Sequence, residues 1–134
     1  MFVHPTPQPA LKTAITILST AFGVYATVSA KMPRQLPARF VRVDRAGGTR
    51  PNLVTDDARI IIDCFADSPE TVESMCGTVD AAMHNAIGTI VDSVFIRNWT
   101  GVTGPTGNYP HPDYLSFERW QMTGSLMLST TTPS

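Results

Sequence analysis

The chain has 134 residues, of which 43% are hydrophobic and 16% are charged, and its formal net charge is −1. This length and composition fit one domain of ordinary size with a true hydrophobic core. A near-neutral chain has no overall attraction to nucleic acid, so the composition excludes a protein that binds polyanions through bulk positive charge.

The first nine residues read MFVHPTPQP, with prolines at positions 5, 7 and 9. Because proline lacks a backbone N–H and disfavours helix in the residue before it, we expect an extended, flexible arm over residues 1–9. Two interpretations of this arm stay open. It is either a disordered terminus or a segment that becomes ordered on a neighbouring subunit.

Apolar side chains recur at helical spacing from Ala10 to Phe22, and Gly23 supplies a natural stop signal. We therefore predict an amphipathic helix over residues 10–22. The wider stretch 10–30 also imitates a secretion signal, because it ends in a cleavage-like Val-Ser-Ala. Against secretion, no Lys or Arg precedes Lys12, and Thr and Ser interrupt the apolar run. The same features argue against a membrane span.

Three strands are predicted in the first half of the chain. Residues 24–28 are rich in β-formers, residues 39–45 alternate in polarity, and residues 59–65 contain the run Ile60-Ile61-Ile62. The paired glycines Gly47-Gly48 are expected to break the second strand. Residues 46–57 should then form a polar, charged loop that contacts something outside the monomer, with a merely solvated loop as the alternative.

A second helix is predicted over residues 68–87. Ser68 is suited to the N-cap position, Pro69 to the first helical position, and Glu70 to the positive end of the helix dipole. Gly88 follows the helix and ends it. The apolar face predicted for this helix consists of Val72, Met75, Cys76, Val79, Ala82, Met83 and Ala86.

The last third is predicted to contain two strands around a long loop. Residues 93–99 form the first strand, residues 100–112 are a loop rich in Gly and Pro, and residues 113–128 form the second strand. The apolar positions of the second strand change face near Glu118-Arg119, which predicts a bulge or bend there. Residues 129–134 form a flexible polar tail.

These elements follow the order helix, strand, strand, strand, helix, strand, strand. Hairpin-like connections between neighbouring strands predict an α+β fold, with a mainly antiparallel sheet, two helices packed on one face and long excursions between strands. We expect a single domain over residues 10–128, flanked by the arm 1–9 and the tail 129–134.

The sequence contains no recognisable catalytic motif. Adjacent Asp56 and Asp57 would point to opposite faces of a strand, and only an unrecognised combination of Asp63, His84 and Glu118 could form a catalytic site. We therefore predict that the protein is not an enzyme, has no catalytic residues and needs no cofactor.

The three histidines are far apart in sequence and no CxxC pattern occurs, so no metal site is predicted. Cys64 and Cys76 are predicted to be buried free thiols, because free cysteine is among the most buried of side chains.

An interaction protein remains, with two candidate contact surfaces. On the charged 46–57 loop and its flanking strand, both signs of charge favour pairing with a complementary copy or partner. In the loop over residues 100–113, exposed aromatic side chains would suit the centre of an interface. The candidate contact residues are Arg42, Arg45, Arg50, Asp56, Asp57, Trp99, Tyr109 and Tyr114.

The string PARFVRVDRAGGTRPNLVTDDARIIIDCFA at residues 37–66, followed by Ser68-Pro69-Glu70, resembles the tail terminator proteins of long-tailed bacteriophages, especially those of actinobacterial hosts. The resemblance is closest over residues 36–90 and looser over the last third. The positions that carry it are Arg39, Phe40, Val41, Arg42, Val43, Arg45, Gly47, Gly48, Asn52, Val54, Thr55, Asp56, Ala58, Cys64, Phe65 and Ala66.

The resemblance implies a ring, hexameric in this family, that caps the head-proximal end of the tail tube and stops its polymerisation. It implies contacts with copies of the same chain, with the major tail tube protein and with the head-completion or stopper protein. Genome DNA would pass through the ring without sequence-specific binding, and no membrane would take part. The ring would assemble in the host cytoplasm and remain in the virion tail.

Under this resemblance, Arg45, Arg50, Asp56 and Asp57 would form ion pairs between subunits. Two alternatives stay open. Another neck component, such as a head–tail stopper or an adaptor, would also be a structural virion protein, and an adaptor would be more helical. A small secreted binding module would require residues 10–30 to act as a signal peptide.

Overall fold

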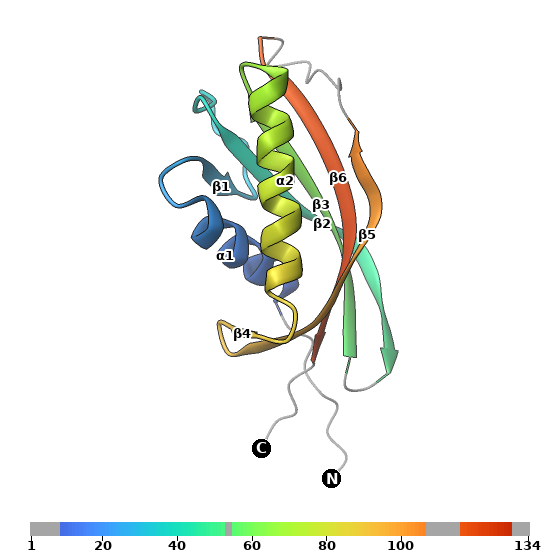
Figure 1. Cartoon of the computed structure of the whole chain (residues 1–134). Helices are drawn as coiled ribbons and strands as arrows, with labels where there is room; N and C mark the ends of the chain where they lie inside the picture. The colour runs from blue at the N-terminus through green and yellow to red at the C-terminus, as the bar shows by residue number, and fades with distance from the viewer. Residues whose placement is uncertain (1–8, 53–54, 107–115, 130–134) are drawn as a thin grey trace.

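Figure 1 shows the computed structural model, which describes residues 9–52, 55–106 and 116–129 as two helices on one side of a curled sheet. The sheet has six strands in the order β1-β2-β3-β6-β5-β4, and only the pair β1 and β2 is parallel. The predicted α+β fold, with a mainly antiparallel sheet and both helices on one face, is confirmed. The elements are α1 (Ala10–Phe22), β1 (Thr27–Ser29), β2 (Phe40–Asn52), β3 (Thr55–Ala66), α2 (Pro69–Asn85), β4 (Ile90–Val91), β5 (Val94–Thr106) and β6 (Glu118–Ser129).

Three of the four predicted helix ends agree with the structure, whereas α2 ends at Asn85 with Ala86 as its C-cap, before the predicted end at Ile87 and Gly88. α1 has the bounds expected from the sequence, and Gly23 follows it with a positive φ of 56°, which glycine adopts at little steric cost. At the start of α2, the Ser68 hydroxyl oxygen accepts a hydrogen bond from the Thr71 backbone N–H at 3.2 Å. Pro69 takes the first helical position, where its missing N–H costs nothing.

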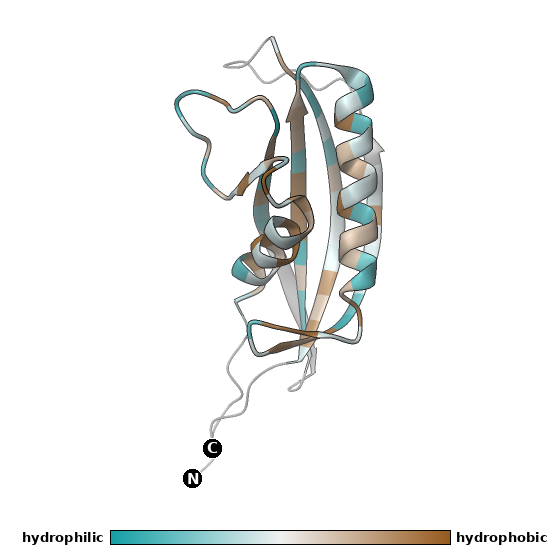
Figure 2. Cartoon of the chain, turned by 60° about the vertical axis from the view of Figure 1, so that its left-hand side comes forward, coloured by the Kyte–Doolittle hydropathy of each residue, from teal (hydrophilic) through white to brown (hydrophobic). Residues whose placement is uncertain are grey.

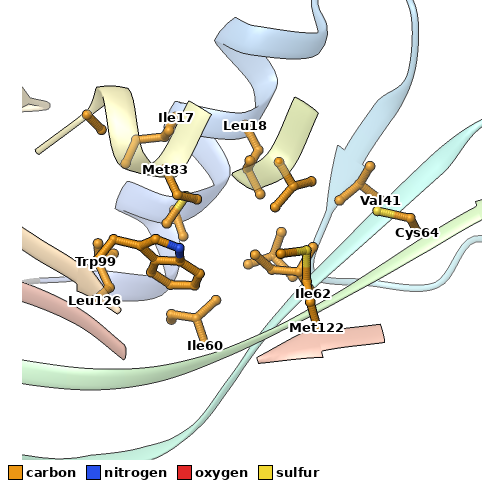
Figure 3. Close-up of a cluster of buried hydrophobic side chains, with 14 of the residues drawn as sticks. Ile17, Leu18, Val41, Ile60, Ile62, Cys64, Met83, Trp99, Met122 and Leu126 are labelled. Carbon is orange, nitrogen blue, oxygen red and sulfur yellow. The ribbon is translucent and has the colours of Figure 1, made fainter. Parts of the chain in front are cut away.

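The main hydrophobic core lies between the helices and one face of the sheet (Figure 3). Alternate residues of β2, β3 and β6 point into it, as the period of a strand requires. The core side chains that the close-up labels are Ile17, Leu18, Val41, Ile60, Ile62, Cys64, Met83, Trp99, Met122 and Leu126.

α1 is an integral part of this core. Ala10, Ala14 and Leu18 have no exposed surface at all. Removal of residues 10–30 would strip these side chains from the core, which counts against the interpretation of that stretch as a cleaved signal. Of the helices in the described residues, neither is long and apolar enough to cross a membrane.

A second, smaller apolar cluster lies on the sheet face that the helices leave open. Leu36, Phe40 and Phe65 are buried there, with Met32 and Phe117 packed against them. The rings of Phe40 and Phe65 are tilted, with their centroids 6.2 Å apart. This end of the sheet is therefore apolar on both faces.

The prediction of a bulge in the last strand is wrong. β6 pairs with β3 from Glu118 to Ser129 with no shift of register. Phe117 belongs to the smaller cluster, whereas Trp120 packs against the main core. The apparent change of face arises because each face of the sheet has its own apolar cluster.

The two segments predicted as contact loops are largely strands. β2 continues through Gly47 to Asn52 and pairs with β3, so most of residues 46–57 form a β-hairpin. Gly47 has a φ of 90° and lies where the register shifts, so the glycines bend the strand without ending it. β5 likewise continues to Thr106, and residues 107–115 lie outside the described residues.

Candidate interaction surfaces

The charged β2–β3 hairpin contains an ion pair within one chain. Arg45 Nη2 lies 3.9 Å from Asp56 Oδ1, and Arg45 Nε donates a hydrogen bond to the Gly47 carbonyl at 3.2 Å. The resemblance implies that these two charged residues pair between subunits. In the isolated chain they already meet each other, so neither is a free contact group.

Asp56 is more deeply buried than a contact residue should be. Only 3% of its surface is exposed, and Oδ2 has no hydrogen-bond partner among the described residues. Burying a carboxylate with so little compensation costs free energy. Asp56 is therefore a structural component of the hairpin, and a reversal of its charge should damage the monomer itself.

The other charged candidates lie on the open sheet face. Arg42 Nη2 is 3.6 Å from Asp44 Oδ2, and both side chains are at least one-third exposed. Asp57 is half-buried, and the alternation of β3 places it on the same face as Asp63 and Phe65. Arg50 lies in β2, but its side chain is outside the described part of the structure.

Trp99 does not have the exposure predicted for an interface aromatic. Only 2% of its surface is exposed, and its ring is part of the main core (Figure 3). Val94 and Ile96 also face the core, and the register of β5 against β6 shifts between Ile96 and Asn98. This bulge moves the inward-facing positions by one residue, so Trp99 turns inward where strict alternation would have turned it outward. The two tyrosines of the same prediction, Tyr109 and Tyr114, lie outside the described residues.

The only catalytic combination considered from the sequence does not assemble. Asp63 is buried on the open sheet face, where it accepts a hydrogen bond from Gln121 Nε2 at 3.0 Å. His84 lies on the exposed side of α2, on the other side of the sheet, with Nδ1 3.4 Å from Asp80 Oδ1. Because Asp63 is on the open face and α2 packs on the other face, the sheet separates Asp63 from His84. Glu118 lies at the start of β6. Among the described residues, no three His, Cys, Asp or Glu side chains gather as metal ligands would.

Cys64 and Cys76 are free and buried, as predicted. They face each other across the interface between β3 and α2. A hydrogen bond between the two thiols, together with burial, raises the pKa of Cys64 well above its usual value. The same hydrogen bond lowers the pKa of Cys76, against the opposing effect of burial.

An apolar groove opens between the helices, at the end where β4 lies. Its volume is about 340 Å³, and it is lined by α1, the last turn of α2, and the segment that leads into β4. Its floor is aliphatic, from Ile17, Ala82, Ala86 and Val91. The turn after β4 is tied to α1 nearby, because the Thr16 hydroxyl donates a hydrogen bond to Asp92 Oδ2 at 2.6 Å.

The β4–β5 hairpin is coloured mostly as hydrophobic in Figure 2, and two of its apolar side chains are exposed. Ile90 is 71% exposed and Phe95 is 43% exposed, and the two are cross-strand partners. Val91 and Val94, on the other face of the hairpin, lean toward the body of the protein. Ile90 and Phe95 therefore form a small exposed apolar patch, which is available for a protein contact.

Sequence reasoning missed both the groove and this hairpin. The signal for the hairpin was the polar pair Asp92-Ser93 between two apolar pairs, and both residues adopt positive φ as a tight hairpin turn requires. The signal for the groove was the small residues Ala21, Ala82 and Ala86 on two helices that pack together. Such residues leave space that larger side chains would fill.

No protein-family model and no curated protein sequence matches this chain. A solved structure does match: a chain in the virion of a native gene transfer agent particle, with a TM-score of 0.59 over 84% of each chain. The two sequences are 12% identical, so the likeness is one of fold.

Proposed function

We propose that this chain is a structural virion protein that forms a ring at the head-proximal end of a phage-type tail tube. The ring ends tube polymerisation and then offers a surface to the head-completion or stopper protein. It is a hexamer of this chain, as in the tail terminators that the sequence resembles. DNA passes through its lumen without sequence-specific contacts.

The fold likeness to a chain of the gene transfer agent virion is the observation that carries this proposal. It spans 84% of both chains, so it concerns the whole domain and not a shared motif. The resemblance of residues 37–66 to tail terminators is independent of it, because that resemblance rests on residue identities. Both point to the same kind of particle.

The surfaces of the monomer supply contacts suited to a ring. The open sheet face carries charged Arg42, Asp44 and Asp57, and the β4–β5 hairpin exposes Ile90 and Phe95. These groups lie on different parts of the molecule. A cyclic ring has a head-to-tail interface and uses two different patches on each subunit, so each of these groups would meet its complement among other residues of a neighbouring subunit.

The direct test is a phage that lacks this chain, examined by electron microscopy. We expect tails of irregular length that are not joined to heads, and restoration of uniform tails when the gene is supplied in trans. A gold label on the chain should lie at the top of the tail. Uniform, joined tails in the deletion, or label elsewhere in the particle, would contradict the proposal.

A matched pair of charge reversals tests the open sheet face. Asp57→Lys should leave the monomer folded and reduce capping of purified tubes, because the reversed charge opposes the neighbouring subunit. Glu73→Lys is the control, because Glu73 is exposed on α2, which lies on the other side of the sheet (Figure 1). Equal capping by both variants would remove the open sheet face from the interface.

The alternative of a head–tail adaptor is less well supported. Strand residues outnumber helix residues in the described chain, whereas the adaptor interpretation expects a more helical protein. A stopper would differ from a terminator in the phage experiment. Loss of a stopper would leave tails of normal length that fail to join filled heads.

A further inference from the structure

The groove between α1 and α2 is uncharged along its whole described lining. Its floor is aliphatic, and hydroxyl and amide groups lie at its rim, among them Thr20 and Asn85. Neither of these two side chains takes part in a hydrogen bond within the described chain. A volume of about 340 Å³ is near the lower end for ligand sites, enough for a few side chains of a bound segment.

A peptide without acidic, lysine or arginine side chains and with few N–H groups fits this lining best. Residues 1–8 of the chain, MFVHPTPQ, match that description, because they contain no Asp, Glu, Lys or Arg and carry Phe2 and Val3 beside two prolines. Proline-rich segments favour an extended conformation whose carbonyl groups point outward as acceptors. The Asn85 amide and the Thr20 hydroxyl can donate to those carbonyls, while Phe2 and Val3 cover the aliphatic floor.

We expect residues 1–8 of one chain to reach the groove of a second chain and not their own groove. The segment joins α1 at Ala10, and the groove begins at Thr16, six residues further along the same helix, or about 9 Å along its axis. To enter its own groove, the segment would have to reverse direction at once, against the stiffness of Pro5, Pro7 and Pro9. Extended, eight residues reach about 27 Å, which is enough to cross to a neighbouring subunit.

We propose that the N-terminal segment Met1–Gln8 of one copy binds in the α1–α2 groove of the next copy. The segment then acts as a strap between subunits, with Phe2 and Val3 as its apolar anchors. This inference adds a contact between subunits to the proposed ring. It rests on the proposed function only in assuming that neighbouring copies meet within such a ring.

Peptide binding to the full-length protein tests the groove. A dye-labelled peptide of residues 1–9 should bind in fluorescence anisotropy, and Ala21→Trp should weaken it about tenfold or more by filling the groove. Ala81→Trp is the control, because Ala81 is exposed on α2 but does not line the groove. Both variants should match the wild type in thermal unfolding. No binding, or equal binding by both variants, would overturn the proposal.

Cysteine cross-linking then tests which chain supplies the segment. A mixture of Val3→Cys and Ala21→Cys chains, each with a different tag, should form a disulfide-linked heterodimer under mild oxidation, while Val3→Cys with Ala81→Cys should not. The native Cys64 and Cys76 are buried and lie against each other, so they are less accessible to a neighbouring chain than the introduced thiols. A disulfide that forms only within the Val3→Cys/Ala21→Cys double variant would show that the segment folds onto its own chain, and would overturn the strap between copies.

Both assays use the purified chain alone, so their outcome is independent of the tail experiments. Absence of peptide binding would leave the capping role open. A normal tail in the deletion phage would in turn leave the peptide result standing, so the two proposals fail separately.

Discussion

The indole ring of Trp99 lies directly against the bare α-carbon of Gly124. A β-carbon at Gly124 would overlap the ring and would stand 2.9 Å from its Cε2 atom. Trp99 pairs in register with Leu126, so the ring reaches diagonally across to the neighbouring strand. The absence of a side chain at residue 124 is therefore what lets the bulged strand β5 turn its tryptophan into the core.

Gly124→Ala should destabilise the protein. The added methyl group would push against the indole, and overpacking of this kind costs about 1–3 kcal/mol in the free energy of unfolding. Gly77→Ala is the control, because a β-carbon at Gly77 meets nothing within 4 Å on the exposed side of α2. That change should stabilise by about 0.5–1 kcal/mol, since glycine is unfavourable inside a helix. Urea denaturation measures both.

A double-mutant cycle separates this overlap from a general intolerance of β6. Trp99→Ala alone should cost about 3–5 kcal/mol, as expected when a large buried side chain is removed. In that background Gly124→Ala should become nearly harmless, because the ring it collides with is gone. Additive costs of the two changes would show that the ring is not the reason for the glycine.

Ser68→Ala should weaken the start of α2. The Ser68 hydroxyl accepts from the Thr71 N–H at 3.2 Å, and loss of such a cap costs about 1 kcal/mol. Ser74→Ala serves as the control, because Ser74 is exposed inside the same helix, where alanine is the better helix former. We expect a lower melting temperature for Ser68→Ala only. Similar melting temperatures for both variants would mean that packing alone sets the end of the helix.

The features that could be predicted from the sequence are those set by neighbours along the chain. The bounds of α1 follow from its apolar spacing and Gly23, and the cap of α2 follows from Ser68 and Pro69. The burial of Trp99 could not be predicted in this way. It depends on a bulge in β5 and on a glycine in β6 that lies 25 positions away in the sequence.

The charged hairpin shows the same limit. Gly47 and Gly48 are a correct turn signal locally, yet pairing with β3 carries β2 past them to Asn52. That extension brings Arg45 and Asp56 together within one chain. Periodicity alone assigned these residues to a free loop. The hydrogen bonds between paired strands stabilise the extension, and they cannot be predicted from the sequence of one strand.

The two thiols should differ in reactivity. The thiolate is the reactive form of a cysteine. The raised pKa of Cys64 therefore slows the alkylation of Cys64, and the lowered pKa of Cys76 speeds the alkylation of Cys76. As the pH rises toward the ordinary pKa of a thiol, Cys76 should ionise first and Cys64 last. Iodoacetamide labelling of the native protein, followed by mass spectrometry, should therefore find Cys76 modified before Cys64.

A pair of substitutions tests whether the hydrogen bond is the cause. Cys64→Ser keeps a donor to Cys76, whereas Cys64→Ala removes it. At one pH, Cys76 should react faster in the serine variant than in the alanine variant. The reverse order would mean that access to the site, rather than the pKa of Cys76, controls the labelling.

Arg45→Ala should destabilise the monomer through the charge it leaves behind. Asp56 is 3% exposed and has Arg45 as its ion-pair partner at 3.9 Å, so the variant buries an unpaired carboxylate. Arg45 is itself about one-third exposed and water screens part of the interaction, so we expect a loss of about 1–3 kcal/mol in the free energy of unfolding. Asp56→Asn in the Arg45→Ala background should recover part of this loss, because the amide carries no charge.

Arg42→Ala is the comparison, since its pair with Asp44 is exposed and should contribute no more than about 1 kcal/mol. If Arg45→Ala and Arg42→Ala proved equally mild in urea denaturation, Asp56 would have to be satisfied by some other group, and the hairpin pair would regain its place as a candidate contact between subunits.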